Sequence, residues 1–131
     1  MKKHLLIVAS VFFLLSGATV LSRTARVIQE RLWGAIAYST ATGSYGFSYD
    51  QETQADAINI AVENCTGDDC KAVVWFHNSC GAFAKGTQGA YGWGIDTDRD
   101  EAKEKAMAAC RTRGAQCHIV QSVCTSQRSG E

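Results

Sequence analysis

Residues 45–80, YGFSYDQETQADAINIAVENCTGDDCKAVVWFHNSC, contain a pattern that recurs in residues 91–124, YGWGIDTDRDEAKEKAMAACRTRGAQCHIVQSVC. Each stretch opens with an aromatic–Gly–aromatic triplet and continues into a polar, acidic segment. Each then carries Ala-x3-Ala-x3-Cys, a second cysteine, an apolar run and a third cysteine. This shared order indicates that the chain contains two copies of one supersecondary unit.

Each copy is predicted to form strand, strand, helix and strand. Residues 45–49 alternate aromatic with small side chains, which is the period of a strand. Residues 55, 58, 61 and 62 are apolar and would share one face of a helix. The elements predicted for the first copy are strands over 33–39, 45–49 and 71–76 and a helix over 51–64. Those predicted for the second are strands over 82–85, 91–95 and 117–122 and a helix from Thr97 or Asp98 to about Arg111.

These elements define an α+β fold. We expect one domain, because 131 residues leave no room for two. The expected architecture is a mostly antiparallel sheet with two helices packed on one face, built from two pseudo-repeated units over about 33–80 and 81–124. A pseudo-twofold relation between the two halves follows from the repeat. The domain is expected to cover 32–124, followed by a flexible tail over 125–131.

The N-terminus resembles an export signal. Lys2 and Lys3 precede an apolar run over 5–15, and Ser16-Gly17-Ala18 supplies small residues for cleavage. We therefore predict a signal peptide over 1–18 and a linker over 19–31. The alternative is an uncleaved membrane anchor extending to about residue 22, since the apolar stretch then approaches the length that spans a bilayer.

Six cysteines in an exported domain of this size indicate disulfides. Their spacing does not provide the paired ligands of a zinc site, so no metal is predicted. Cys70 and Cys80 bracket an extended strand and would lie too far apart to bond, and the same holds for Cys117 and Cys124. The economical pairing is Cys65–Cys70, Cys110–Cys117 and Cys80–Cys124, with the last bond joining the two halves.

Composition and motifs argue against several functions. The chain has 13 basic and 13 acidic residues and no basic face, so nucleic acid is not an expected partner. It contains no nucleophile motif, and no catalytic residue or cofactor is predicted. Asp68 and Asp69 are expected to serve a tight turn. Three alternating acids, Asp96, Asp98 and Asp100, fit helix capping better than a calcium loop.

The aromatic residues are the best candidates for binding. The strands predicted over 45–49 and 91–95 carry aromatic or apolar residues on one face and Gly or Ser on the other. Either the aromatic faces pack under the helices, or they form an exposed surface for a protein or a glycan. Glycines such as Gly46 and Gly92 would permit close backbone approach. The candidate binding residues are Trp75, His77, Tyr45, Tyr91 and Trp93.

Several segments together resemble the bacterial family called domain of unknown function 4189. They are WGAIAYS at 33–39, the YGF and YGW triplets, VVWFHNSCGAFAKG at 73–86, and the terminal Cys-x6-Cys. The resemblance covers about residues 33–124. It implies a small secreted or envelope protein, and it transfers no catalytic residue because the family has no established activity.

The expected function is therefore a non-enzymatic binding or interaction module, secreted or periplasmic, whose partner is another protein or an envelope component. One alternative is an accessory subunit of a membrane complex, held by an uncleaved N-terminal anchor with the domain on the exported side. Another is a small secreted hydrolase that uses His77 as a general base. We expect contact with a membrane only through the N-terminal segment, if that segment is uncleaved.

Overall fold

The computed structural model describes residues 32–126, which form two successive units. The first unit contains β1 (Trp33–Tyr38), β2 (Tyr45–Gln51), α1 (Gln54–Glu63) and β3 (Lys71–His77). The second contains β4 (Cys80–Lys85), a short 3-10 turn η1 (Thr87–Gly89), β5 (Tyr91–Asp96), α2 (Arg99–Arg111) and β6 (His118–Cys124). The predicted α+β class and the repeated order of strand, strand, helix and strand are confirmed.

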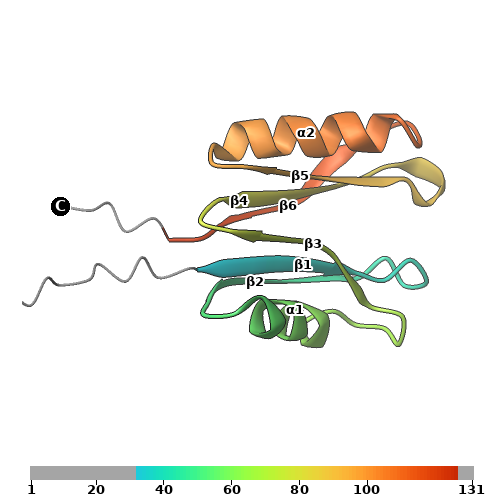
Figure 1. The fold of residues 1–131 in the computed structure, drawn as a ribbon. Helices are drawn as coiled ribbons and strands as arrows, with labels where there is room; N and C mark the ends of the chain where they lie inside the picture. Colours follow the sequence, from blue (N-terminus) through green and yellow to red (C-terminus); the bar gives the residue numbers. More distant parts are fainter. Residues whose placement is uncertain (1–31, 127–131) are drawn as a thin grey trace, which may run out of the picture.

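The two units have the same topology. The first forms an antiparallel sheet in the order β2-β1-β3, and the second an antiparallel sheet in the order β5-β4-β6. The sheets pack face to face, with α1 on the outer face of one and α2 on the outer face of the other (Figure 1). The expectation of one sheet with both helices on one face is thus corrected. The domain has four layers, and each helix covers its own sheet.

The alternation of small and large side chains along the central strands explains these four layers. In β1, Ala35 and Ala37 pack under α1, whereas Ile36 and Tyr38 point into the space between the sheets. In β4, Phe83 points into the same space. Because both faces of each sheet are apolar, each sheet needs two coverings. A helix covers the face of small residues, and the opposite sheet covers the face of large residues.

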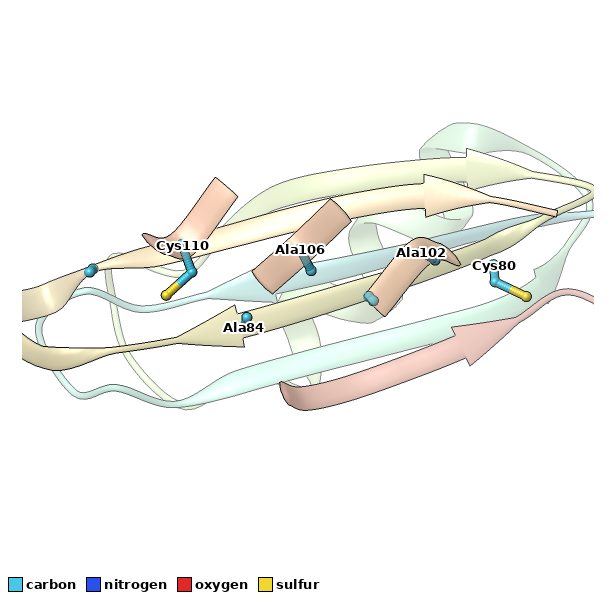
Figure 2. Close-up of a cluster of buried hydrophobic side chains, with 7 residues drawn as sticks. Cys80, Ala84, Ala102, Ala106 and Cys110 are labelled. Atoms are coloured by element: carbon cyan, nitrogen blue, oxygen red, sulfur yellow. The ribbon is translucent and has the colours of Figure 1, made fainter. Parts of the chain in front are cut away.

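The helices approach the sheets closely because alanine and glycine line the contact. On the second sheet, Ala102, Ala106 and Cys110 of α2 are fully buried against β4, where Ala84 lies (Figure 2). A Cβ atom added to Gly92 would lie 2.3 Å from the backbone nitrogen of Cys110. On the first sheet, a Cβ added to Gly46 would lie 2.2 Å from the carbonyl oxygen of Ala61. The glycine faces of β2 and β5 therefore pack under the helices.

The aromatic faces of the same two strands do not pack under the helices. The side chains of Tyr45, Phe47, Tyr91 and Ile95 are partly buried against the core between the sheets. The sequence left two arrangements open, with the aromatic faces either packed under the helices or exposed as a surface. The structure shows a third, in which these faces lie partly buried against the core between the sheets. Helix packing uses the small residues, because large rings would hold a helix too far from the sheet.

The three disulfides join Cys65 to Cys70, Cys110 to Cys117 and Cys80 to Cys124, which are the expected pairs. The location of the last bond differs from the expectation. Cys80 is the first residue of β4 and pairs in register with Cys124 of β6, so the bond lies within the second sheet and does not join the two halves. The boundary between the units lies before Cys80, because a sharp turn at Asn78, with a φ of 47°, ends the first unit.

The C-terminal boundary is later than expected. The backbone nitrogen of Thr125 donates to the carbonyl of Ser79, and Ser126 donates to the carboxylate of Asp50 at the end of β2. Both residues are therefore part of the ordered domain. The predicted signal peptide, anchor and linker over 1–31, and the rest of the predicted tail over 127–131, lie outside the described residues. Between residues 32 and 126, neither helix is long and apolar enough to cross a membrane.

Candidate functional site

Trp75 and His77, two of the predicted binding residues, lie on the outer face of the edge strand β3. Trp75 pairs in register with Ala35, whose side chain packs under α1, so the indole points to the α1 side of the sheet. The helix lies mainly over β1 and β2 and leaves β3 less covered. Trp75 therefore remains 45% exposed.

Trp33 joins these two residues. It pairs in register with His77, and the two rings have their centroids 4.9 Å apart at an interplanar angle of 35°. On the other side of β1, Trp33 pairs with Gln51 of β2. An amide, an indole and an imidazole thus follow one another across the sheet, with Trp75 two residues along β3. We call Trp33, Trp75 and His77 the aromatic patch.

Trp33 was not among the residues predicted from the sequence. Its strand was expected, but the partner of a residue across an antiparallel pair depends on the register, and the sequence did not determine the register of β1 and β3. The spacing of the repeat could have indicated it. The pair Trp33 and His77 is separated by the same 44 residues as the disulfide pair Cys80 and Cys124.

The second unit has different chemistry at the corresponding positions. Cys80 and Cys124 occupy the place of Trp33 and His77, and Ser122, which pairs with Ala82, occupies the place of Trp75. The shared fold therefore requires no rings at these positions. The aromatic patch is a property of the first unit alone.

Tyr45 lies away from the aromatic patch, in a shallow groove between β2 and α1 of about 510 Å³. The wall of the groove is strand β2, and Ile60 and Asn64 of α1 form its other side. The side-chain amide of Asn64 donates to the carbonyl of Phe47, and that of Gln51 donates to the carbonyl of Tyr49. Side chains of the domain therefore already occupy these two carbonyls beside the groove.

Tyr91 and Trp93 are also separate from the patch. The ring of Tyr91 lies 5.5 Å from that of Tyr38, and the guanidinium of Arg113 lies 5.1 Å above it. Tyr91 is therefore partly buried against the core between the two sheets. Trp93 is 45% exposed, on edge strand β5 of the other sheet. The five predicted residues thus divide among separate places, and only Trp75 and His77 come together.

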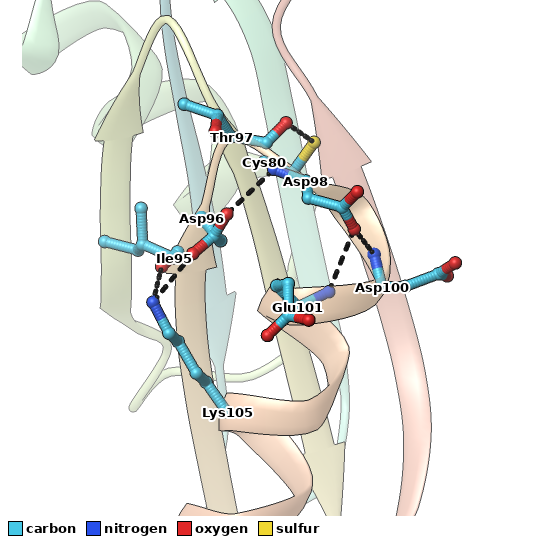
Figure 3. Close-up of polar contacts among 8 residues, drawn as sticks. All are labelled: Cys80, Ile95, Asp96, Thr97, Asp98, Asp100, Glu101 and Lys105. Carbon is cyan, nitrogen blue, oxygen red and sulfur yellow. Dashed lines mark hydrogen bonds and ion pairs between the residues drawn. The ribbon is translucent and has the colours of Figure 1, made fainter.

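The acidic residues before α2 serve local structure (Figure 3). Asp98 is the N-cap, and its carboxylate accepts from the backbone nitrogens of Asp100 and Glu101 at 2.8 and 3.1 Å. Lys105 contacts the carboxylate of Asp96 at 2.8 Å. Hydrogen bonding to Lys105 lowers the pKa of Asp96 below its ordinary value. Within residues 32–126, no group of three or more His, Cys, Asp or Glu side chains could hold a metal ion.

Asp69 serves a turn, as expected. Its carboxylate accepts hydrogen bonds from the hydroxyls of Ser39 and Thr40 and from the backbone nitrogen of Ala41. The bond from buried Ser39 is the main cause that lowers the pKa of Asp69. This carboxylate ties the β1–β2 turn to the loop that the Cys65–Cys70 disulfide closes.

The disulfides, the four layers and the exposed rings define a class of protein. It is a small extracytoplasmic domain, since several disulfides in one small domain are typical of oxidising compartments. The chain belongs to the family described as domain of unknown function DUF4189, whose sequence pattern matches residues 33–124.

Relatives of the chain occur in mycobacteria. It is 40% identical over 76 residues to protein Rv1269c of Mycobacterium tuberculosis and equally to protein Mb1300c of Mycobacterium bovis. Each match spans 58% of this chain and 59% of the relative, so a large part of those proteins has no counterpart in the match. The NMR structure of Rv1813c from M. tuberculosis is similar as well, with a TM-score of 0.54 and 32% identity over 71% of this chain and 74% of that one.

Proposed function

We propose that this protein is an exported, non-enzymatic binding module of the cell envelope, secreted or periplasmic, and that the aromatic patch is its binding surface. The observation that carries the proposal is the exposure of Trp75 beside the contacting rings of Trp33 and His77. A soluble domain loses stability by leaving large rings in water, so an exposed ring beside other rings favours a role in binding.

The surroundings of His77 support binding over catalysis. A general base needs a nucleophile or a bound water in reach and a group that orients it. The ring partner of His77 is Trp33, which is neither a nucleophile nor an acid. The three disulfides support a role outside the cytoplasm, where a clamped domain can present a rigid surface to an envelope component.

Cross-linking in the native host tests the proposal. The full chain, with a C-terminal tag, is expressed at its natural level, cross-linked in intact cells, purified and analysed by mass spectrometry and for bound carbohydrate. The proposal predicts an envelope component that is recovered with the natural chain and strongly reduced with Trp75→Ala. Trp93→Ala is the matched control, because Trp93 is equally exposed but lies on the other sheet. Equal recovery with all three chains, or no component above a tag-only control, would contradict the proposal.

The same samples report the mature N-terminus. Cleavage after Ala18 is expected for a released module. An intact N-terminus would favour the accessory subunit held by its own anchor, and the recovered component would then be the rest of that complex.

A further inference from the structure

We infer that the ligand of the aromatic patch is a neutral saccharide, bound with the C–H face of a sugar ring against Trp75 and with hydroxyls directed to His77 and Gln51. This inference rests on the proposed function and specifies the chemical class of the ligand. It follows from the size of the patch, its charge, the arrangement of its polar groups and its restriction to one of two equivalent units.

The size of the patch favours a small ligand over a protein surface. A fully buried aromatic side chain contributes about 150–250 Å². Trp33 is half-buried and Trp75 is already more than half covered. The three rings therefore offer a ligand less area than three fully exposed aromatic side chains would. A stable protein interface covers about 800 Å² on each partner. One or two sugar rings match the available area better than a folded partner does.

The charge of the patch favours a neutral ligand. Strand β1, WGAIAY, carries no charged side chain, and the single lysine of β3, Lys71, lies at the opposite end of that strand from His77. A phosphate, sulfate or carboxylate ligand would normally meet arginine or lysine. Neutral hydroxyls, in contrast, are suited to an imidazole and an amide, which both donate and accept hydrogen bonds.

The arrangement of the groups matches the two sides of a sugar ring. A pyranose has a face of C–H groups and an edge of hydroxyls. Trp75 offers a flat, 45% exposed ring at the open edge of the sheet, and two residues along β3 the His77 ring packs against that of Trp33 at an interplanar angle of 35°. Gln51 follows at the next strand, in register with Trp33. A saccharide of at least two rings, with one ring on Trp75, would therefore have His77 and, two strands away, Gln51 on the same side of the sheet.

Comparison with the second unit shows whether the fold itself requires the rings of the aromatic patch. In the second unit the equivalent positions hold a disulfide and Ser122, and that sheet is formed with the same topology. The rings of the first unit are thus not required by the fold.

Calorimetric titration of the full exported chain tests the inference. The probes are a tetramer of N-acetylglucosamine, a β-1,4-linked tetramer of glucose, and a polysulfated oligosaccharide as the charged control. We expect saturable binding of at least one neutral tetramer, with a change in tryptophan fluorescence, and no tighter binding of the sulfated probe. Trp75→Ala should weaken the neutral binding by about tenfold or more and remove the fluorescence change.

Matched variants keep the test specific. His77→Ala should weaken binding by several fold, and Trp93→Ala should leave affinity unchanged. Thermal unfolding of all variants monitors the fold, and Trp75 and Trp93 are equally exposed, so their replacement should have similar, small effects on stability. No saturable binding of either neutral tetramer, or equal weakening by Trp75→Ala and Trp93→Ala, would overturn the inference.

The two proposals fail in different ways. If cross-linking recovers a protein in a Trp75-dependent manner while neither neutral tetramer binds, the saccharide inference is wrong and the binding module stands. If the tetramers do not bind and cross-linking shows no dependence on Trp75, both are wrong.

Discussion

The rings of Trp33 and His77 lie 4.9 Å apart across β1 and β3, at the positions that the Cys80–Cys124 disulfide occupies across β4 and β6. Both pairs stand in register between the first residue of a central strand and the last part of an edge strand. Both are separated by 44 residues in the sequence. One backbone arrangement thus carries a covalent bond in one unit and an exposed aromatic contact in the other.

This correspondence predicts that a fourth disulfide can be introduced. In the double variant Trp33→Cys with His77→Cys, the two new thiols would face each other as Cys80 and Cys124 do. The bond would close a loop as long as the natural one, so we expect it to raise the free energy of unfolding by up to about 4 kcal/mol. Denaturant unfolding checks the gain, and peptide mapping without reduction checks the bond.

The reference for this comparison is the double variant Trp33→Ser with His77→Ser, which lacks the rings and the bond alike. If peptide mapping finds the two introduced cysteines unpaired in folded protein, the proposed equivalence of the positions is wrong. Both double variants should also lose saccharide binding, because the substitutions remove two of the three rings of the aromatic patch.

Removal of natural disulfides should affect stability according to loop length. The Cys80–Cys124 bond has a sequence separation of 44 residues and the Cys65–Cys70 bond one of 5. The chain-entropy description gives about 4 kcal/mol for the first and about 2 kcal/mol for the second. Denaturant unfolding of the variants Cys80→Ala with Cys124→Ala and Cys65→Ala with Cys70→Ala measures both. A larger loss for the short loop would show that local packing, and not loop closure, controls the effect.

The sequence was sufficient to predict the elements of each unit because their signals are local. The Ala-x3-Ala-x3-Cys spacing predicts a helix with a narrow small face, and Ala102, Ala106 and Cys110 are indeed the fully buried residues of α2. The layer arrangement was not predicted. It depends on the assignment of both faces of β1, where Ile36 and Ala37 are equally apolar but pack on opposite sides.

The site was predicted only in part for a related reason. Trp75 and His77 were both named from the sequence and stay predictions as binding residues, and the structure places them on one face of β3, where exposed and buried residues alternate near the end of the strand. Trp33 was missed because its contact with His77 depends on the register between strands far apart in sequence. Tyr91 stays a prediction as a binding residue, and its sequence pattern does not reveal that its ring packs beside those of Tyr38 and Phe83.

Gly92 should not tolerate a methyl group. In Gly92→Ala the new Cβ would lie 2.3 Å from the backbone nitrogen of Cys110 and 2.5 Å from the carbonyl oxygen of Ala106, so α2 would have to move away from β5. Overpacking of this kind costs about 1–3 kcal/mol. Denaturant unfolding measures the loss. Gly89→Asn is the control, because no atom lies within 4 Å of an added Cβ there and asparagine accepts its φ of 74°. A similar loss for both variants would contradict the close approach of α2.

The Asp69 carboxylate should make the stability of the domain depend on acid pH. Its hydrogen bonds from Ser39, Ala41 and Thr40 lower its pKa in the folded state below that of the unfolded chain. The unfolded state then binds a proton more readily, so the contribution of Asp69 is complete above about pH 4 to 5 and is lost as the pH falls through the lowered folded-state value. Thermal unfolding between about pH 6 and pH 2 should show a decline in midpoint, and Asp69→Asn should have a lower midpoint at neutral pH and a shallower decline.

Asp68→Asn is the matched control, since the neighbouring Asp68 is exposed and the three hydrogen bonds to the turn belong to Asp69. If Asp69→Asn declines as steeply as the natural chain while Asp68→Asn flattens the profile, the carboxylate that holds the β1–β2 turn is Asp68.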